Sequence, residues 1–333
     1  MKLAPDAEIR GVVSTDKTSS RIIPLAAVRD AAEHVYAAAL RTPLVRLNVP
    51  VPNAEIYLKL ENLQPIGSFK IRGAYNAVRL LDASRRSKGV WTVSAGNAAQ
   101  GVALAAQKYG VQCRVLIIET APETKKNAIR ALGAEIVEAS FDECWQALQD
   151  RKHPQMDSCF VHPFDDDDFI AGNATVGLEI LEDLPDVDCV VASYGGGGLS
   201  CGVASVMEAL KPSVKVYGAE PESAAPLSRS FSSGQAERFP DWTATWVDGC
   251  GGKSVLETMW PLASRLLAGS IVSSLEDIRK AMKLVAEKNH VICEGAGACA
   301  VAAGLSGVPK GKVVCVVSGG NIDLSKFCEL VQG

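Results

Sequence analysis

The sequence contains few histidines and no closely paired cysteines, and both shortages argue against a zinc site of the zinc-finger type. Only four histidines occur in the 333 residues, and none flanks a cysteine at the spacing of a zinc site. The ten cysteines include no C-x-x-C pair, and most lie inside apolar runs. We therefore expect buried free thiols in a protein of a reducing compartment.

Two further absences limit the partners of the protein. No run approaches the roughly 20 apolar residues that a membrane helix needs, and the charged start of the chain, MKLAPDAEIR, does not resemble a signal peptide. Lysine and arginine are scattered and the net charge is −4, which favours neither nucleic acid nor an acidic membrane surface. We expect a cytoplasmic protein with a small-molecule substrate and without nucleic-acid or membrane partners.

What the chain does contain is an alternation of short β-rich runs and helical patterns. Several runs are apolar throughout, as parallel strands are when helices cover both faces of the sheet, and the segments between them place apolar residues at three-to-four spacing. The order predicts an α/β fold, and we expect the acidic run 165–168 to cap the helix that follows it. Predicted strands span 56–60, 89–93, 111–119, 135–139, 158–162, 188–193, 214–219 and 312–317, and predicted helices span 26–39, 97–108, 123–132, 198–210, 275–287 and 297–305.

Lys70 lies in the segment PIGSFKIRGA, between bulky apolar residues and just after a glycine turn. Such surroundings remove water from an ammonium group and lower its pKa, which a Schiff-base lysine requires. A single lysine near the start of a helix is more often a surface residue. Lys70 alone therefore does not identify a functional site, and other segments of the sequence must support that interpretation.

Two glycine-bearing segments each follow a predicted strand and open a helix. The first, SAGNAAQG, begins at Ser94; its backbone amides can bind an anion such as a carboxylate, or Ser94 or Asn97 simply caps the helix. The second consists of four consecutive glycines, and several amides without neighbouring Cβ atoms can converge there on a phosphate. The sequence GGKS at 251–254 ends like a P-loop, but Val247 occupies the place of its first glycine.

A last segment, SGGN, begins at Ser318 after the final predicted strand, where open α/β sheets place ligands. In this order the four segments resemble those of fold type II pyridoxal-phosphate (PLP) enzymes, and most closely the serine/threonine dehydratase family, which includes serine racemase and phenylserine dehydratase. The resemblance extends from Arg41 to about Leu324. It implies a tryptophan synthase beta-like fold of two open, twisted, mostly parallel sheets flanked by helices, PLP as the cofactor, and a homodimer.

The resemblance also implies domains and a role for each site residue. A large PLP-binding domain would comprise residues 1–81 and 166–333, and a small substrate-side domain residues 82–165. Lys70 and Ser94 would be the catalytic residues. The cofactor would contact Phe69, Lys70, Asn97, Gly195, Gly196, Gly197, Gly198, Glu294 and Ser318, with the four glycines at the phosphate, Asn97 at the 3′-oxygen and Ser318 at the pyridine nitrogen. The substrate would contact Ser94, Ala95, Gly96, Asn97 and Ala98.

A serine beside the pyridine nitrogen leaves the ring less electron-withdrawing than a carboxylate does, which favours β-elimination over transamination. The freed Lys70 amine would remove the Cα proton and the β-hydroxyl would leave, which converts a 3-hydroxy amino acid to a 2-oxo acid and ammonia. Ala95 occupies the position of a second, racemising serine, so we expect dehydration. Ala98 replaces a histidine of many relatives, and we hypothesise that it admits a larger substrate side chain such as phenyl.

Several alternatives remain. Glu220 and Ala224 match a racemase-type metal site, but Pro226 replaces an acidic ligand, so we expect no metal unless Glu222 compensates. A PLP-dependent β-replacement synthase and a non-catalytic ligand-binding protein on the same scaffold are alternative functions. Serine, threonine, 3-hydroxyaspartate and phenylserine all remain possible substrates.

Overall fold

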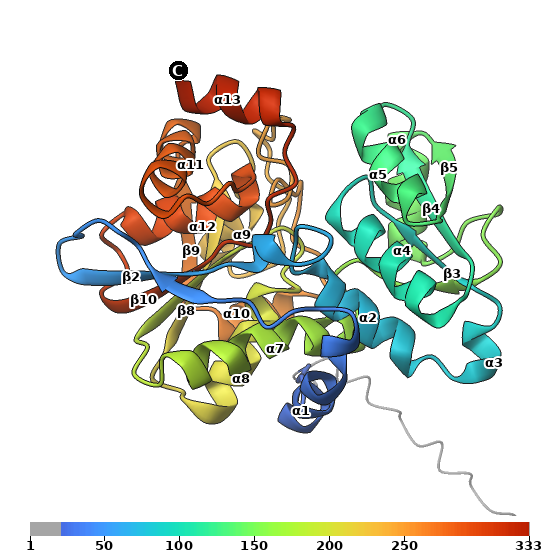
Figure 1. Cartoon of the computed structure of the whole chain (residues 1–333), viewed down its shortest axis with the longest axis horizontal. Coiled ribbons are helices and arrows are strands. Elements are labelled where there is room, and N and C mark those ends of the chain that lie inside the picture. The colour runs from blue at the N-terminus through green and yellow to red at the C-terminus, as the bar shows by residue number, and fades with distance from the viewer. Residues whose placement is uncertain (1–20, 333) are drawn as a thin grey trace, which may run out of the picture.

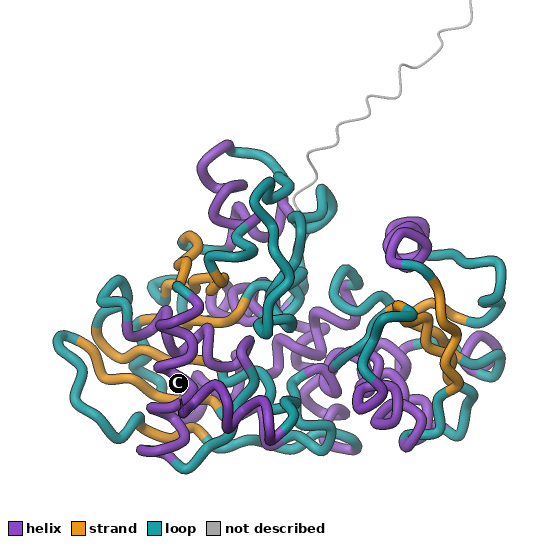
Figure 2. The backbone as a smooth tube through the Cα atoms, turned by 90° about the horizontal axis from the view of Figure 1, so that it is seen from above, coloured by secondary structure: helices purple, strands orange, loops and turns teal. Residues whose placement is uncertain are grey.

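A computed structural model describes residues 21–332 of the chain and contains two sheets, each at the centre of one lobe (Figure 1). Residues 1–20, on which the expectation of no signal peptide was based, lie outside the described residues. Seen from above, the strands form two separate groups with helices on either side of each (Figure 2).

The larger sheet has six strands in the order β1-β2-β10-β7-β8-β9, and only the pairing of β1 with β2 is antiparallel. The smaller sheet has four parallel strands in the order β5-β4-β3-β6. The strands of the larger sheet are β1 (Leu44–Arg46), β2 (Ala54–Lys59), β7 (Cys189–Ser193), β8 (Lys215–Pro221), β9 (Gly269–Ser273) and β10 (Gly311–Val316), and those of the smaller are β3 (Val90–Val93), β4 (Cys113–Ile118), β5 (Glu135–Ala139) and β6 (Cys159–Phe160).

Helices cover both faces of each sheet. In the larger lobe α7, α8 and α10 pack on one face and α11 and α12 on the other, while α4 and α6 lie on opposite faces of the smaller sheet (Figure 1). The helices are α1 (Leu25–His34), α2 (Lys70–Leu80), α3 (Ala83–Arg86), α4 (Asn97–Tyr109), α5 (Glu123–Ala131), α6 (Phe141–Asp150), α7 (Asp167–Asp183), α8 (Ser200–Leu210), α9 (Pro226–Ser233), α10 (Trp260–Leu266), α11 (Leu275–Asn289), α12 (Gly295–Leu305) and α13 (Leu324–Gln332), with 3-10 turns η1 (Val35–Ala37) and η2 (Glu61–Leu63).

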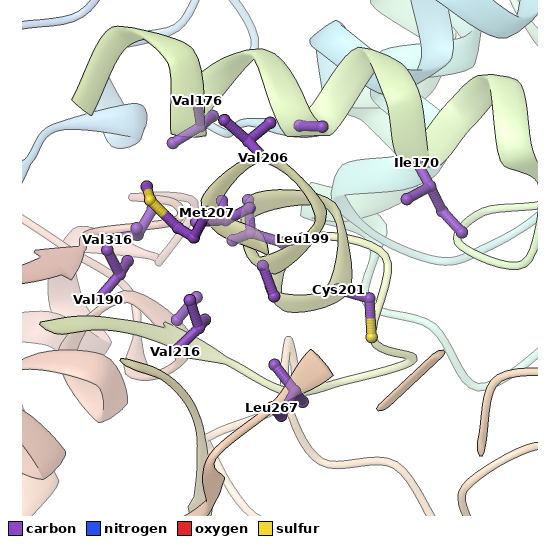
Figure 3. Packing of buried hydrophobic residues seen from close by; sticks show 14 of the residues in the cluster. Ile170, Val176, Val190, Leu199, Cys201, Val206, Met207, Val216, Leu267 and Val316 are labelled. Atoms are coloured by element: carbon purple, nitrogen blue, oxygen red, sulfur yellow. The ribbon is translucent and has the colours of Figure 1, made fainter. Parts of the chain in front are cut away.

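Alternate side chains of each central strand belong to different hydrophobic clusters, one on each face of the sheet. Val314 and Val316 of β10 face one cluster, which Figure 3 shows from close by with residues of α7 and α8, whereas Val313 and Cys315 face the other. Because successive side chains of a strand point to opposite faces, a strand covered on both sides must be apolar throughout. This explains why the sequence showed continuous apolar runs.

The predicted fold class is confirmed: the chain is α/β, with two mostly parallel sheets flanked by helices. All eight predicted strands occur, within a few residues of their expected ends. The prediction missed β1 and β9, because β1 has three residues and β9 is only partly buried. The helix predicted for 26–39 is shorter, since α1 ends at His34 and continues as η1. The division into domains at residues 82 and 166 remains a prediction.

Two smaller expectations, the buried free cysteines and the acidic cap of a helix, are confirmed. All ten cysteines are free, and eight of them are buried. Asp166 caps α7 by accepting a hydrogen bond from the Phe169 amide at 2.9 Å, as expected for the acidic run. None of the helices between residues 21 and 332 combines the length and hydrophobicity that a membrane span requires.

Candidate active site

One cavity of about 500 Å³ lies where strands of both sheets end. The segments that follow β3, β6, β7 and β10 all contribute to its lining, together with the start of α2. Carboxyl ends of parallel strands are the usual place for ligands in open α/β sheets. The cavity brings together these residues that the sequence had singled out: Phe69, Lys70, Ser94, Ala95, Gly96, Asn97, Ala98, Gly195, Gly196, Glu294 and Ser318.

Lys70 begins α2, and its amine lies in the cavity wall. The Nζ atom donates a hydrogen bond to the carbonyl oxygen of Pro163 at 2.6 Å, and the rings of Phe69 and Phe169 have centroids 5.2 and 5.4 Å from it. Burial lowers the pKa of this amine to about 8, because the charged form loses its hydration. At pH 7 about a tenth of Lys70 is therefore a neutral, nucleophilic amine, far more than of an exposed lysine.

The 94–98 segment forms the turn into α4. The Ser94 hydroxyl accepts a hydrogen bond from the Gly96 amide at 3.1 Å, and no side chain caps the first turn of the helix. The interpretation as an ordinary N-cap by Ser94 or Asn97 is therefore wrong. The residues at the N-terminus of α4 instead line the cavity, and a helix N-terminus suits a carboxylate.

Asn97 is held by two side chains from the other lobe. Its Nδ2 donates to Glu294 at 2.8 Å, and its Oδ1 accepts from Asn321 Nδ2 at 2.7 Å. Burial, followed by the charge of Asp248, raises the pKa of the Glu294 carboxyl to about 8. A Cβ at Gly319 would lie 2.3 Å from Glu294 Oε1, so any larger residue there would displace this carboxyl from its present position.

The four consecutive glycines form the turn from β7 to α8, and neighbouring residues pack closely against this turn. An added Cβ would lie 2.8 Å from the Gly249 carbonyl at Gly195 and 2.2 Å from the Phe164 ring at Gly196. Gly197 has a φ of +89° and Gly198 would meet the Phe164 carbonyl at 3.0 Å. Of these four glycines, only Gly195 and Gly196 line the cavity. The glycines are therefore needed for the close packing of this turn, and two of them are also accessible to a ligand.

Ser318 lies beside the start of α2. Its backbone oxygen accepts a hydrogen bond from the Phe69 amide at 3.1 Å, and Ser68 pairs with Gly319 in an isolated bridge. The end of β10 thus fixes the backbone that carries Lys70. A desolvated amine, a glycine turn without Cβ atoms and a serine around one cavity fit an aldehyde-bearing, phosphorylated pyridine.

Comparison with known proteins decides the family. Residues 35–319 match the family described as "Pyridoxal-phosphate dependent enzyme". The chain belongs to the pyridoxal-phosphate dependent enzymes. It is 40% identical over 317 residues to the L-threonine ammonia-lyase of Thermotoga maritima, an alignment that covers 93% of this chain and 79% of that protein.

Two solved structures are similar to this PLP-dependent enzyme over nearly their whole length. Maize serine racemase superposes with a TM-score of 0.86 at 32% identity, covering 93% of this chain and 96% of the racemase. The processed threonine deaminase isoform 2 of Solanum lycopersicum has a TM-score of 0.82 at 32% identity, with 92% of both chains covered. The predictions of PLP as cofactor and of an ammonia-lyase of hydroxy amino acids are confirmed by these relatives.

The PLP-dependent enzyme also has cavity residues that the sequence did not reveal as a group. Gly249, Gly251 and Gly252 line the cavity beside Gly195, and Trp145 and Leu148 of α6 line it from the small lobe. In the sequence, the glycines at 251–252 stand out only as part of an incomplete P-loop. Pro163, the partner of Lys70, gave no sequence signal, because its carbonyl group is common to every residue.

The metal site suggested by the racemase resemblance does not fit this PLP-dependent enzyme. The buried Glu220 carboxylate accepts hydrogen bonds from the amides of Leu227 and Ser228 at 2.7 and 2.8 Å and from the Ser270 hydroxyl at 2.6 Å. Glu222, the possible substitute, accepts from the Leu275 amide at 2.9 Å. Glu220 therefore holds the first turn of α9, and no cluster of three or more metal-binding side chains occurs within residues 21–332.

Proposed function

We propose that this enzyme dehydrates a 3-hydroxy amino acid, with L-threonine as the first candidate, to a 2-oxo acid and ammonia. The observation that carries the proposal is the single cavity that joins the Lys70 amine to the 94–98 turn and to the glycine turn after β7. The relative at 40% identity is an L-threonine ammonia-lyase, which supports threonine as the substrate.

In this proposal Lys70 carries the cofactor and then acts as the base. Bound PLP supplies an electron-withdrawing ring that stabilises negative charge at the substrate Cα. The buried amine, with its pKa lowered to about 8, takes the Cα proton, and a base performs best when its pKa lies near the working pH. The Pro163 carbonyl keeps the free amine directed into the cavity.

Other residues bind and orient the substrate and the cofactor. The amides at the start of α4, with Ser94, bind the substrate carboxylate, and Ala95 and Ala98 leave space around the substrate side chain. The turn of Gly195, Gly196, Gly197 and Gly198, of which the first two line the cavity, would receive the phosphate of PLP. Phe69, Asn97, Glu294 and Ser318 would surround its pyridine ring. Ala95 offers no hydroxyl to return a proton from the opposite face, so we propose elimination rather than racemisation.

The test is release of 2-oxo acid from L-threonine, L-serine, 3-hydroxyaspartate and phenylserine by the wild-type enzyme and by Lys70→Ala. The variant should lose activity by several orders of magnitude, since it lacks both cofactor attachment and base. Borohydride reduction of the wild type should fix PLP on a peptide containing Lys70. Turnover of Lys70→Ala at a wild-type rate would disprove the assigned role.

Two competing functions are separated in the same assay. A β-replacement synthase supplied with serine and a thiol would form a thioether instead of pyruvate, and a non-catalytic binder would release no product at all.

The proposal also includes the expected homodimer and the cytoplasmic location. A mass measured by light scattering tests the first, and cell fractionation tests the second.

A further inference from the structure

A short turn of residues 162–165 links β6 of the small sheet to α7 of the large lobe, and it touches two parts of the site. The Pro163 carbonyl accepts the hydrogen bond from Lys70 Nζ at 2.6 Å. The next residue, Phe164, packs its ring on Gly196, where an added Cβ would lie 2.2 Å from a ring carbon. The turn therefore contacts both the amine and the glycine turn.

The turn is held from within by His162. Its Nδ1 atom accepts hydrogen bonds from the backbone amides of Asp165 at 2.8 Å and Phe164 at 3.3 Å. An imidazole nitrogen can accept only when it carries no proton. The side chain is 2% exposed, and burial lowers its pKa to about 3, so the ring is neutral and the acceptor is present at all physiological pH values.

The same ring also orients side chains. It meets the Phe164 ring edge-on at a centroid distance of 4.6 Å and the Phe160 ring at 5.7 Å. At the end of the turn, the Asp165 carboxylate accepts hydrogen bonds from Thr258 at 2.8 Å and from Arg151 at 3.0 Å. His162 thus fixes the middle of a segment whose far end is already tied to the large lobe.

We propose that His162 is a positioning residue for cofactor binding. Its neutral imidazole holds the 162–165 turn so that the Pro163 carbonyl directs the Lys70 amine into the cavity while the Phe164 ring supports the glycine turn. His162 lies behind these groups and is not among the residues that line the cavity. The inference rests on the role proposed above for Lys70.

The test compares His162→Leu, which removes the acceptor but keeps apolar volume, with His162→Asn, whose amide oxygen can replace Nδ1 as acceptor. Phe160→Leu is the matched control, because it removes a ring that packs on His162 and leaves the acceptor intact. For each variant we would measure the dissociation constant of PLP, the yield of borohydride-fixed PLP on Lys70, and the thermal midpoint of the apo protein.

His162→Leu should bind PLP about tenfold more weakly, the effect of losing hydrogen bonds to buried amides. His162→Asn should stay within about threefold of the wild type, and Phe160→Leu should lose stability without losing affinity. Unchanged affinity in His162→Leu, or an equal loss in Phe160→Leu, would overturn the proposal.

If His162→Leu does not fold, the comparison of His162→Asn with His162→Gln decides. Glutamine places its oxygen near the Nε2 position and should bind PLP more weakly than the asparagine variant; equal affinities would refute the role of Nδ1. A wild-type enzyme whose Lys70 peptide carries no PLP after borohydride would instead contradict the proposed function.

Discussion

Two ionisable side chains in the cavity are shifted toward neutrality from opposite directions. Burial lowers the pKa of Lys70 to about 8 and raises that of Glu294 to about 8. Both shifts have the same cause, since a charge taken out of water is destabilised whatever its sign. The sequence indicated the first shift through the bulky neighbours of Lys70. It did not indicate the second, because the burial of Glu294 depends on Asn97 and Gly319 from distant segments.

Glu294→Gln should change how stability depends on pH. The wild-type carboxyl holds its proton in the folded state up to about pH 8, whereas in the unfolded chain it loses the proton near 4.5. The folded state therefore binds the extra proton between these values, and the free energy of unfolding falls as pH rises through them.

Glutamine has no such proton, so relative to the wild type the variant should become more stable from pH 5 to pH 9. Thermal midpoints of both apo proteins at pH 5, 7 and 9 check this. A constant difference in midpoint across that range would contradict the assigned protonation.

At the scale of single elements, tight turns decide the shape of the site. The turn after β7 needs glycine mainly because Phe164, Tyr194 and the 249–250 backbone pack directly on it. The first turn of α9 relies on the Glu220 carboxylate, since Pro226 contributes no amide and the next two amides bind Glu220.

Gly196→Ala should destabilise the folded apo protein, because the added methyl overlaps the Phe164 ring. Overpacking of this kind typically lowers the free energy of unfolding by about 1–3 kcal/mol. Combining it with Phe164→Leu should recover part of the loss. Urea denaturation of the two apo variants provides the comparison, and no recovery would show that the ring is not the obstacle.

Glu220→Ala should destabilise the apo protein by about 1–3 kcal/mol for each buried amide left without an acceptor. Urea denaturation measures the loss. Because the carboxylate is committed to α9, Mg²⁺ or EDTA should leave the thermal midpoint of the wild type unchanged. A midpoint raised by Mg²⁺ in the wild type but not in Glu220→Ala would indicate a metal ligand after all.

At the scale of the whole molecule, a buried ionic network fixes the helix that carries Lys70. Arg72 contacts Glu61 at 2.7 Å and Glu179 at 2.6 Å, and Lys59 contacts Glu179 at 2.5 Å. These residues join β2, η2, α2 and α7 in the interior of the molecule. Each charge is compensated by its neighbours, so the loss of one leaves the others buried and unpaired.

Arg72→Met should therefore lower the free energy of unfolding by about 3–5 kcal/mol. Urea denaturation of the apo protein tests this, with Arg130→Met, an exposed arginine paired with Glu123 at 3.1 Å, as the control. The control should change stability by less than about 1 kcal/mol. Similar losses in the two variants would mean that burial of the network does not determine its contribution.

The sequence by itself determined the α/β class and the apolar strands, since both follow from local spacing. Lys70 and the glycine turn stood out through their surroundings, but the roles proposed for them, and PLP as the cofactor, were implied by the resemblance that the four segments carry together. Only the tertiary structure decided how those segments meet. The Pro163 carbonyl, the His162 acceptor, the proton on Glu294 and the use of Glu220 for α9 depend on contacts between segments far apart in the chain. A backbone carbonyl or a buried carboxyl acquires its role from what folding places beside it, and that neighbour is not encoded in the surrounding sequence.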